Sequence, residues 1–179
     1  MLPGISTEQL RSRLNRMVAD GLLTRQRYRE VPPRVDYELT ERSRELMPVL
    51  GALARWGYDW AWSAPREGEE VNVGAVVRLA PGIVTPPAGL EGTVELIVDA
   101  EGATPERRYL VTLRRGAAVV SEVGGEEPAA TVRGPSTAWV LALGPEGVTD
   151  ALTVSGRRPL ADAVLEGFSG AAARRAAAA

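Results

Sequence analysis

The chain of 179 residues contains no cysteine and no histidine. The missing cysteines exclude disulfides, thiol nucleophiles and cysteine-based zinc sites, and the missing histidines exclude catalytic schemes that use an imidazole base. Lysine is also absent, so that all 21 basic residues are arginine. The sequence further lacks the P-loop and the GxGxxG pattern of nucleotide-binding sites. We therefore predict that the protein is not an enzyme and that it holds neither a metal nor a cofactor.

Long apolar segments are missing as well. The run from Ala138 to Leu143 is among the longest, and a membrane-spanning helix needs about 18 apolar residues. The start, Met1–Ser6, has neither the basic nor the apolar region of a signal peptide. With 45% hydrophobic and 25% charged residues, the composition is that of a globular protein with one large domain or two small ones. The sequence therefore predicts a cytoplasmic protein that does not enter a membrane.

Charge is distributed unevenly along the chain. Residues 1–35 carry seven arginines against three acidic residues, a net charge of +4. Residues 36–64 have a net charge of −2, and residues 65–179 a net charge of −4. A basic segment ahead of an acidic body is typical of a protein that meets a polyanion with one end. Scattered surface arginines explain the same pattern without any partner, so charge alone leaves both interpretations open.

A change of composition near residue 65 divides the chain. Residues 1–64 show helical periodicity around one hairpin, and residues 65–70 are polar, contain Pro65 and Gly68 and lack periodicity, which is typical of a linker. Residues 71–168 contain short alternating segments separated by glycine and proline, which predict a sheet with helices. Residues 169–179 form an alanine-rich tail to which we assign no function.

The first segment begins with a helix signal. Ser6 and Gln9 form a capping box, and Leu10, Leu14, Met17 and Val18 follow as one apolar stripe until Asp20-Gly21 ends the helix. Two strands are expected next, Leu22–Tyr28 and Arg34–Leu39, joined by a loop with two prolines. Thr40 then caps a long helix expected from Glu41 to Trp62. The apolar side of this helix consists of Leu46, Val49, Leu50, Leu53, Trp56 and Trp60.

Four stretches of this segment carry a closer likeness: Leu2–Ser6, Asp20–Arg25, Val31–Thr40, and Leu46–Leu50 followed by Trp56-Gly57. Together they closely resemble the HxlR-type winged-helix transcriptional regulators. The resemblance implies a recognition helix at Ser6–Ala19, a wing tip at Tyr28–Arg34 and a helix used in dimerisation at Glu41–Trp62. It also implies double-stranded DNA and a second copy of the chain as partners.

Family members carry a dimerisation helix and the first helix of the helix-turn-helix ahead of the recognition helix. In this sequence residues 1–64 correspond to a winged helix that lacks those first helices, and DNA binding is expected where they are present. A helix suits the major groove, while an arginine-bearing hairpin suits phosphates or the minor groove. The candidate DNA contacts, chosen from the polar face of the helix and its rim and from the hairpin, are Thr7, Gln9, Ser12, Arg13, Arg16, Arg27, Arg29 and Arg34.

The second segment predicts a small domain of strands and helices. Alternating apolar residues favour strands at 93–99, 108–114, 117–123 and 129–133, which we expect to pair as an antiparallel meander. Helices are expected at 71–79, 135–143 and 159–168, with a further strand at 152–154. The fold class of the whole chain is therefore α+β, a partial winged helix-turn-helix followed by an antiparallel sheet with helices.

Two stretches of this segment, Ala129–Pro135 before a helix and Val154–Arg157 before a last helix that ends in Phe168, resemble the sterol-carrier-protein domain. The resemblance covers roughly residues 90–168 and implies an apolar cavity for a hydrophobic small molecule, with Tyr109 or Trp139 as its polar group. The candidate lining residues are Val94, Leu96, Val98, Tyr109, Val111, Leu113, Trp139, Leu143, Leu160, Val164 and Phe168. Alternatively, these apolar faces close on each other and leave no cavity.

Two functions follow from these patterns. The first is a DNA-binding transcriptional regulator whose C-terminal domain senses a hydrophobic molecule. The second is a lipid-binding or small-molecule-binding module in which the winged-helix remnant does not contact DNA.

Overall fold

The computed structural model describes residues 5–29, 34–66, 69, 71–102, 104–122 and 126–170. The chain forms two compact units, Met1–Met47 and Pro48–Ala179. This division differs from the boundary expected after residue 64, because residues 48–64, which were expected to belong to the first segment, pack within the second unit. Of the expected linker, Pro65, Arg66 and Glu69 are described, and they lie outside helices and strands.

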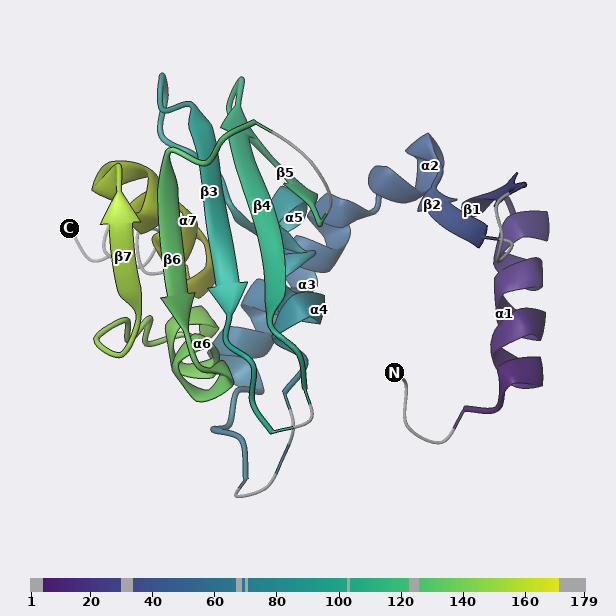
Figure 1. Cartoon of the computed structure of the whole chain (residues 1–179), viewed down its shortest axis with the longest axis horizontal. Helices are drawn as coiled ribbons and strands as arrows, with labels where there is room; N and C mark the ends of the chain where they lie inside the picture. Colours follow the sequence, from purple (N-terminus) through teal and green to yellow (C-terminus); the bar gives the residue numbers. More distant parts are fainter. Residues whose placement is uncertain are drawn as a thin grey trace. The chain divides into compact units, whose positions relative to one another are not determined.

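The first unit has the order helix, hairpin, short helix (Figure 1). Its elements are α1 Thr7–Ala19, β1 Leu23–Tyr28, β2 Arg34–Leu39 and α2 Glu41–Arg44. The predicted capping box is confirmed, since the Ser6 side chain accepts from the Gln9 amide while the Gln9 side chain accepts from the Ser6 amide. Gly21 takes a left-handed φ of 71° after the helix, as the sequence predicts.

The single long helix expected over 41–62 is wrong. The structure has two helices instead, α2 and then α3 Met47–Trp60. Pro48 explains the break, because a proline has no N–H to donate to the carbonyl of Arg44 and its ring clashes with that carbonyl. A proline is tolerated in the first turn of a helix, so the chain restarts at Met47.

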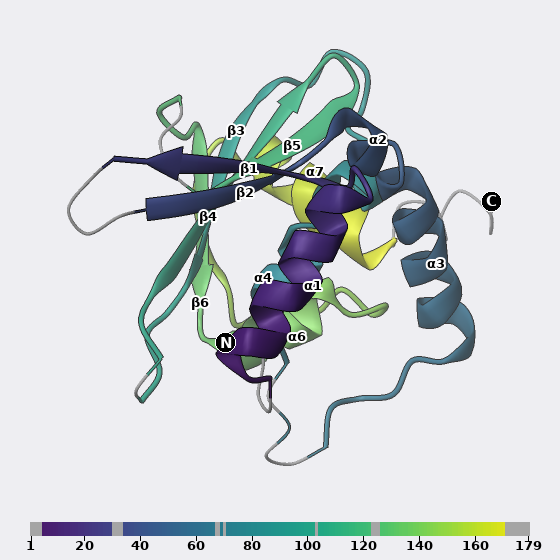
Figure 2. The same cartoon turned by 90° about the vertical axis from the view of Figure 1, so that its right-hand side faces the viewer.

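The second unit places its helices on one face of a five-stranded sheet (Figures 1 and 2). The helices are α3, α4 Val73–Val77, α5 Ala80–Ile83, α6 Ser136–Leu143 and α7 Arg158–Ser169. The strands are β3 Gly92–Val98, β4 Arg107–Arg114, β5 Ala117–Ser121, β6 Ala130–Gly134 and β7 Thr153–Gly156. The α+β class is confirmed, and α7 extends into the segment expected as tail, whose residues 171–179 lie outside the described part.

The strand order of this sheet corrects the expected meander. The order is β5-β4-β3-β6-β7, and β6 pairs with β3 in parallel, for example Leu96 with Val132. The sheet is therefore mixed rather than antiparallel. Sequence alternation identifies strands but does not say which strands are neighbours, and here the chain crosses from the edge strand β5 back past β4 and β3.

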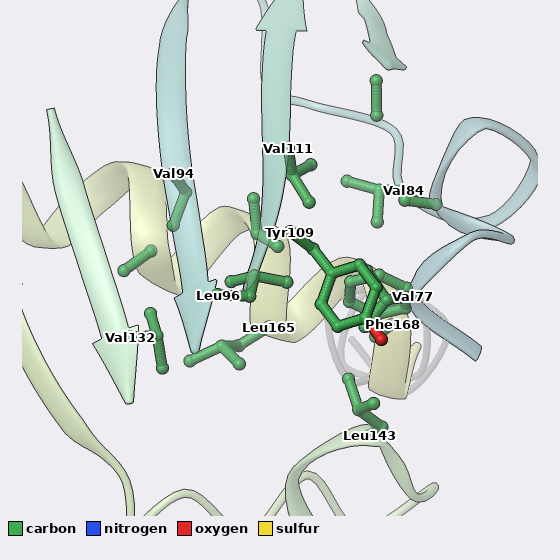
Figure 3. Packing of buried hydrophobic residues seen from close by; sticks show 14 of the residues in the cluster. Val77, Val84, Val94, Leu96, Tyr109, Val111, Val132, Leu143, Leu165 and Phe168 are labelled. Carbon is green, nitrogen blue, oxygen red and sulfur yellow. The ribbon is translucent and has the colours of Figure 1, made fainter. Parts of the chain in front are cut away.

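The core of the second unit lies between the sheet and the helices (Figure 3). Tyr109, Leu96 and Val111 project from the sheet, while Phe168 and Leu143 approach them from α7 and α6. All five are at most 3% exposed. Burying side chains of this size contributes about 1.5–3 kcal/mol each to stability.

In the described part of the chain, no helix is both long enough and apolar enough to cross a lipid bilayer. The same residues contain no group of three or more acidic side chains placed to hold a metal ion.

Candidate nucleic-acid interface

Helix α1 offers an exposed polar face. None of its residues is buried, and all five predicted contacts are exposed. Four of them fall on one side at helical spacing: Gln9, Ser12, Arg13 and Arg16. Thr7 lies three and seven residues before Leu10 and Leu14, and therefore on the apolar side of the helix. The structure thus brings four of these candidates together and separates Thr7 from them.

Two of these four candidates already have partners within the unit. The Gln9 side-chain oxygen lies 3.1 Å from the Ser6 amide nitrogen that donates to it, so Gln9 contributes to the helix cap. Arg16 lies 3.7 Å from the Asp20 carboxylate, with its side chain 86% exposed. An exposed pair at this distance contributes little to stability and gives way readily to another anion.

The hairpin separates the predicted wing residues. Tyr28 pairs with Arg34 and Arg27 with Val35, and because neighbouring residues of a strand point to opposite faces, Arg27 and Arg34 lie on opposite faces of the hairpin. Arg29 is exposed just beyond the end of β1. Residues 30–33 of the expected wing tip lie outside the described residues.

Arg34 is held by its neighbours on one face of the hairpin. Its guanidinium donates to both Asp36 oxygens, at 2.9 and 2.7 Å, and lies over the Tyr28 ring, 5.5 Å from the ring centre. A bidentate pair fixes the arginine plane and neutralises its charge locally. Arg27 and Arg29 are therefore better placed than Arg34 to attract phosphate.

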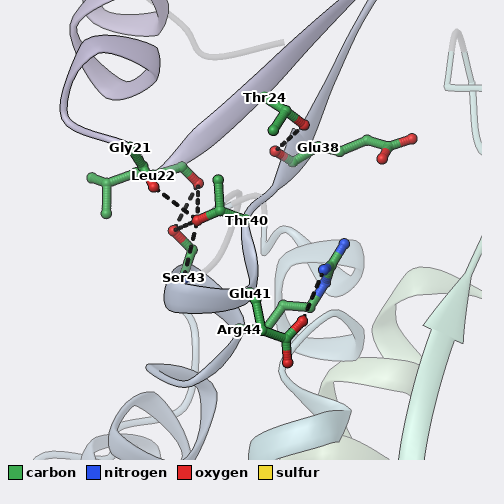
Figure 4. A network of polar contacts seen from close by, with 8 residues as sticks. All are labelled: Gly21, Leu22, Thr24, Glu38, Thr40, Glu41, Ser43 and Arg44. Atoms are coloured by element: carbon green, nitrogen blue, oxygen red, sulfur yellow. Dashed lines mark hydrogen bonds and ion pairs between the residues drawn. The ribbon is translucent and has the colours of Figure 1, made fainter.

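A polar network connects the end of α1, the hairpin and α2 (Figure 4). The Thr40 hydroxyl donates to the Gly21 carbonyl at 2.8 Å, and the Ser43 hydroxyl donates to the Leu22 carbonyl at 2.7 Å. Ser43 is only 7% exposed. The network fixes the turn after α1 against the start of α2. Sequence reasoning identified Thr40 as a cap but missed Ser43, which occupies the third position of the same capping turn.

The hairpin contains one further ring contact that the sequence analysis did not include. The guanidinium of Arg25 lies over the ring of its cross-strand partner Tyr37, 5.8 Å from the ring centre. Arg25 is partly buried, unlike Arg27 and Arg29. The signal that could have identified this contact is the hairpin register, because pairing Leu23 with Leu39 places Arg25 directly opposite Tyr37.

The predicted ligand residues of the second unit form part of one packed core. Val98 is partly buried, and the other ten are at most 3% exposed. The Trp139 indole nitrogen donates to the Ile97 carbonyl at 2.9 Å in the interior, so this polar group serves the fold. Tyr109 is buried with its hydroxyl close to Gly74 of α4.

Comparison with known proteins identifies the first part of the chain. Residues 1–64 match the model of the HxlR-like helix-turn-helix family. An uncharacterized HTH-type transcriptional regulator of Synechocystis, sll1512, is 49% identical over 59 residues, which are 33% of this chain and 44% of that protein. The regulator YkvN of Bacillus subtilis is 38% identical over 69 residues, 38% of this chain and 58% of the relative. The chain thus spans about half the length of the curated relatives that it matches.

Two solved structures show likenesses to different parts of the chain. The redox regulator HypR in its oxidized form is 35% identical and covers 35% of this chain and 65% of its own, with a TM-score of 0.31. A conserved hypothetical protein from Thermus thermophilus, described as possibly a sterol carrier protein, is 17% identical and covers 61% of this chain and 94% of its own, with a TM-score of 0.40. From the family match and the relatives, residues 1–64 are an HxlR-like helix-turn-helix segment.

Proposed function

We propose that the protein is a DNA-binding transcriptional regulator. The observation that carries this proposal is the exposed face of α1, with Ser12, Arg13 and Arg16, in a segment matched to the HxlR-like helix-turn-helix family. In such a unit the helix contacts base edges in the major groove and the hairpin contacts phosphates. Arg13 and Arg16 supply donors suited to guanine, and Arg27 and Arg29 supply positive charge for the DNA backbone.

The test uses the full chain and duplexes selected from a random-sequence pool. We expect Arg29→Ala to weaken binding to all duplexes alike and to reduce the slope of log affinity against log salt by about 1. Arg16→Ala should cost about 1–3 kcal/mol on the selected duplex and little on a scrambled one. Arg107→Ala, which removes an exposed arginine of the second unit, is the matched control and should leave the affinity within twofold. Equal affinities for all three variants and the wild type would contradict the proposal.

We further propose that the protein acts as a homodimer through α3. Five large apolar side chains form a stripe along this helix, which we call the α3 stripe: Val49, Leu50, Leu53, Trp56 and Trp60. They are between 43% and 78% exposed. A contiguous apolar stripe of this kind is typical of an interface, and the family resemblance assigns this helix to dimerisation. A second copy of the chain is therefore the occupant that we propose.

The second unit is proposed to bind a hydrophobic molecule. The resemblance of residues 90–168 to the sterol-carrier domain and the wholly apolar character of the sheet and helix faces support this role. Since these faces are in contact in the structure, a ligand would enter by moving α4, α5 or α7 away from the sheet. The Tyr109 hydroxyl, beside Gly74, is the polar group that we assign to such a ligand.

Thermal unfolding of the full chain tests ligand binding. Palmitate, cholesterol and naphthalene serve as probes, and a ligand at 100 times its Kd stabilises the folded protein by about 2.7 kcal/mol. Tyr109→Phe keeps the ring and should weaken the response to palmitate but not to naphthalene, which cannot accept from a hydroxyl. No rise in Tm with any probe would overturn ligand binding. A rise in a chain that binds no DNA would favour the alternative function, a lipid-binding or small-molecule-binding module.

A further inference from the structure

The face of α3 opposite the α3 stripe is anchored to the second unit. Gly51 is the one buried residue of this helix, and a side chain at this position would overlap the backbone of Gly82 in α5. The absence of a Cβ therefore permits the two backbones to approach closely. On the same face, Ala54 packs against the core.

Two side chains of this anchored face donate to backbone carbonyls of other helices. The Arg55 guanidinium donates to the Ile83 carbonyl at 2.8 Å, and the Tyr58 hydroxyl donates to the Leu143 carbonyl at 2.7 Å. Ile83 and Leu143 are the last residues of α5 and α6. The last carbonyls of a helix have no partner within it, so α3 supplies partners that the two shorter helices need.

The Tyr58 contact is partly shielded from water. Burial raises the pKa of the Tyr58 hydroxyl above its ordinary value of 10.0, as expected for a group that is withdrawn from solvent. The Trp62 ring meets the Tyr58 ring edge-on, with ring centres 5.5 Å apart. A Cβ on Gly144, directly after α6, would lie 3.0 Å from the Trp62 ring. Trp62 therefore covers the contact between Tyr58 and the end of α6.

Ile83 and Leu143, whose carbonyls accept these two hydrogen bonds, connect α3 to the core. The side chains of Ile83 and Leu143 are 2% and 3% exposed and belong to the core cluster, while their carbonyls accept from α3. A shift of either side chain in the core therefore moves a carbonyl that holds α3. Helix α3 is thus attached to the core on one face and presents the α3 stripe on the other.

We propose that α3 couples the packing of the core of the second unit to dimerisation, so that a ligand that repacks this core changes the affinity between two copies of the chain. The inference rests on the dimer proposed above and adds its regulation. By thermodynamic linkage, the factor by which a ligand changes the affinity of dimerisation equals the factor by which dimerisation changes the affinity for that ligand. Because operator spacing follows the geometry of a dimeric regulator, this coupling would transmit ligand binding to DNA affinity.

The experiment measures the dimer Kd of the full chain by sedimentation equilibrium, with every variant held well below its unfolding temperature. Tyr58→Phe and Arg55→Met remove the two hydrogen bonds without touching the α3 stripe, and we expect each to raise the dimer Kd at least threefold. Gly51→Ala, which forces the backbones of α3 and α5 apart, should raise it more. If Gly51→Ala does not fold, the first two variants still decide the outcome.

Ile97→Ala is the matched control, because Ile97 is only 4% exposed in β3 but does not belong to the core cluster between the sheet and the helices. It lowers the stability of the second unit without repacking that core and should leave the dimer Kd within twofold. The coupling is overturned if the three α3 variants all dimerise like the wild type. It is also overturned if Ile97→Ala weakens the dimer as much as Tyr58→Phe does, because general loss of stability then explains the effect. A wild-type chain that is monomeric at all concentrations overturns the dimer itself, which separates the two failures.

Discussion

Single residues decide how the elements of the first unit meet. Ser43 is small, polar and nearly buried, and its hydroxyl reaches a carbonyl 21 residues earlier in the chain. Thr40 performs two tasks at once, since it caps α2 and donates to Gly21. The capping by Thr40 is visible in the sequence, but the hydrogen bonds of Thr40 to Gly21 and of Ser43 to Leu22 are not, because these partners lie far away in the chain. Their role becomes visible only when the hairpin brings the partners together.

At this scale we predict the effect of Ser43→Ala. The substitution removes the 2.7 Å hydrogen bond to Leu22, and a bond of this kind contributes about 0.5–1.5 kcal/mol. The Leu22 carbonyl retains the Thr40 amide at 3.2 Å, so the loss should stay within that range. Faster amide hydrogen exchange in residues 21–44 than in the wild type would report this loss of stability. Ser12→Ala on the exposed face of α1 is the control and should leave exchange unchanged.

Among the secondary-structure elements, local sequence signals predicted the bounds of helices and strands better than they predicted which strands pair. Capping at Ser6, the turn at Gly21 and the alternation in β3 and β4 give nearly the observed bounds, because each depends on neighbours in sequence. The parallel pair β3–β6 was not predictable in this way, since it depends on packing across the whole unit. Pro48 predicts the break before α3, but the apolar periodicity of residues 46–60 favours one continuous helix, and the prediction of a single helix over 41–62 followed that periodicity.

Part of the candidate site was predictable for the same reason. Ser12, Arg13 and Arg16 share a face because helical spacing is a local property. The ion pair between Arg34 and Asp36 was not foreseen, although the two residues lie on the same face of β2, two positions apart. Likewise, the apolar spacing of residues 94–113 identified the core face but could not say whether that face leaves room for a ligand. Close packing is a property of several elements together.

Helix α6 offers a test at the scale of an element. Trp139→Phe removes the buried hydrogen bond to the Ile97 carbonyl, and an acceptor left unsatisfied in the interior costs about 1–3 kcal/mol. Urea unfolding of the full chain should show a loss of that size. Leu141→Ala, at a position 53% exposed on the same helix, is the control and should change stability by less than about 0.5 kcal/mol. Equal effects of both substitutions would contradict the role assigned to Trp139.

Opposite charges connect neighbouring strands on the sheet surface away from the helices. Arg108 contacts Glu106 and Glu95, and Arg133 contacts Glu106 and Asp99. The hydrogen bond from Arg108, together with the charges of Arg108 and Arg133, holds the pKa of Glu106 below its ordinary value. The stabilising effect of this carboxylate is therefore present at neutral pH and is lost as the pH falls through the lowered pKa.

For the whole molecule, the α3 stripe has the largest consequence. We predict that Leu53→Glu shifts the chain from dimer to monomer in sedimentation velocity and raises the dimer Kd at least tenfold. The reason is that an unpaired carboxylate in an apolar interface costs well over the about 1.4 kcal/mol that corresponds to a factor of ten. Leu53 is 61% exposed, so the folded monomer tolerates the charge.

Val119→Glu provides the control for this prediction. Val119 is 55% exposed on β5 and, next to the core residue Ala118, points to the face of the sheet opposite the helices. The substitution introduces the same charge into the same unit. It should leave the dimer intact. Dissociation by Val119→Glu, or none by Leu53→Glu, would place the contact between the two copies elsewhere on the molecule.

The parallel pairing of β3 with β6 also determines the order in which the second unit assembles during synthesis. Strand β3 leaves the ribosome before its partner β6, and the hairpin β4–β5 covers only one of its edges in the meantime. Until residues 130–134 emerge, the other edge displays unpaired backbone groups beside an apolar face, a combination that promotes aggregation. Closing the sheet requires a contact between distant parts of the chain, which slows folding. The nascent protein thus passes through a vulnerable interval that ends only when β6 docks.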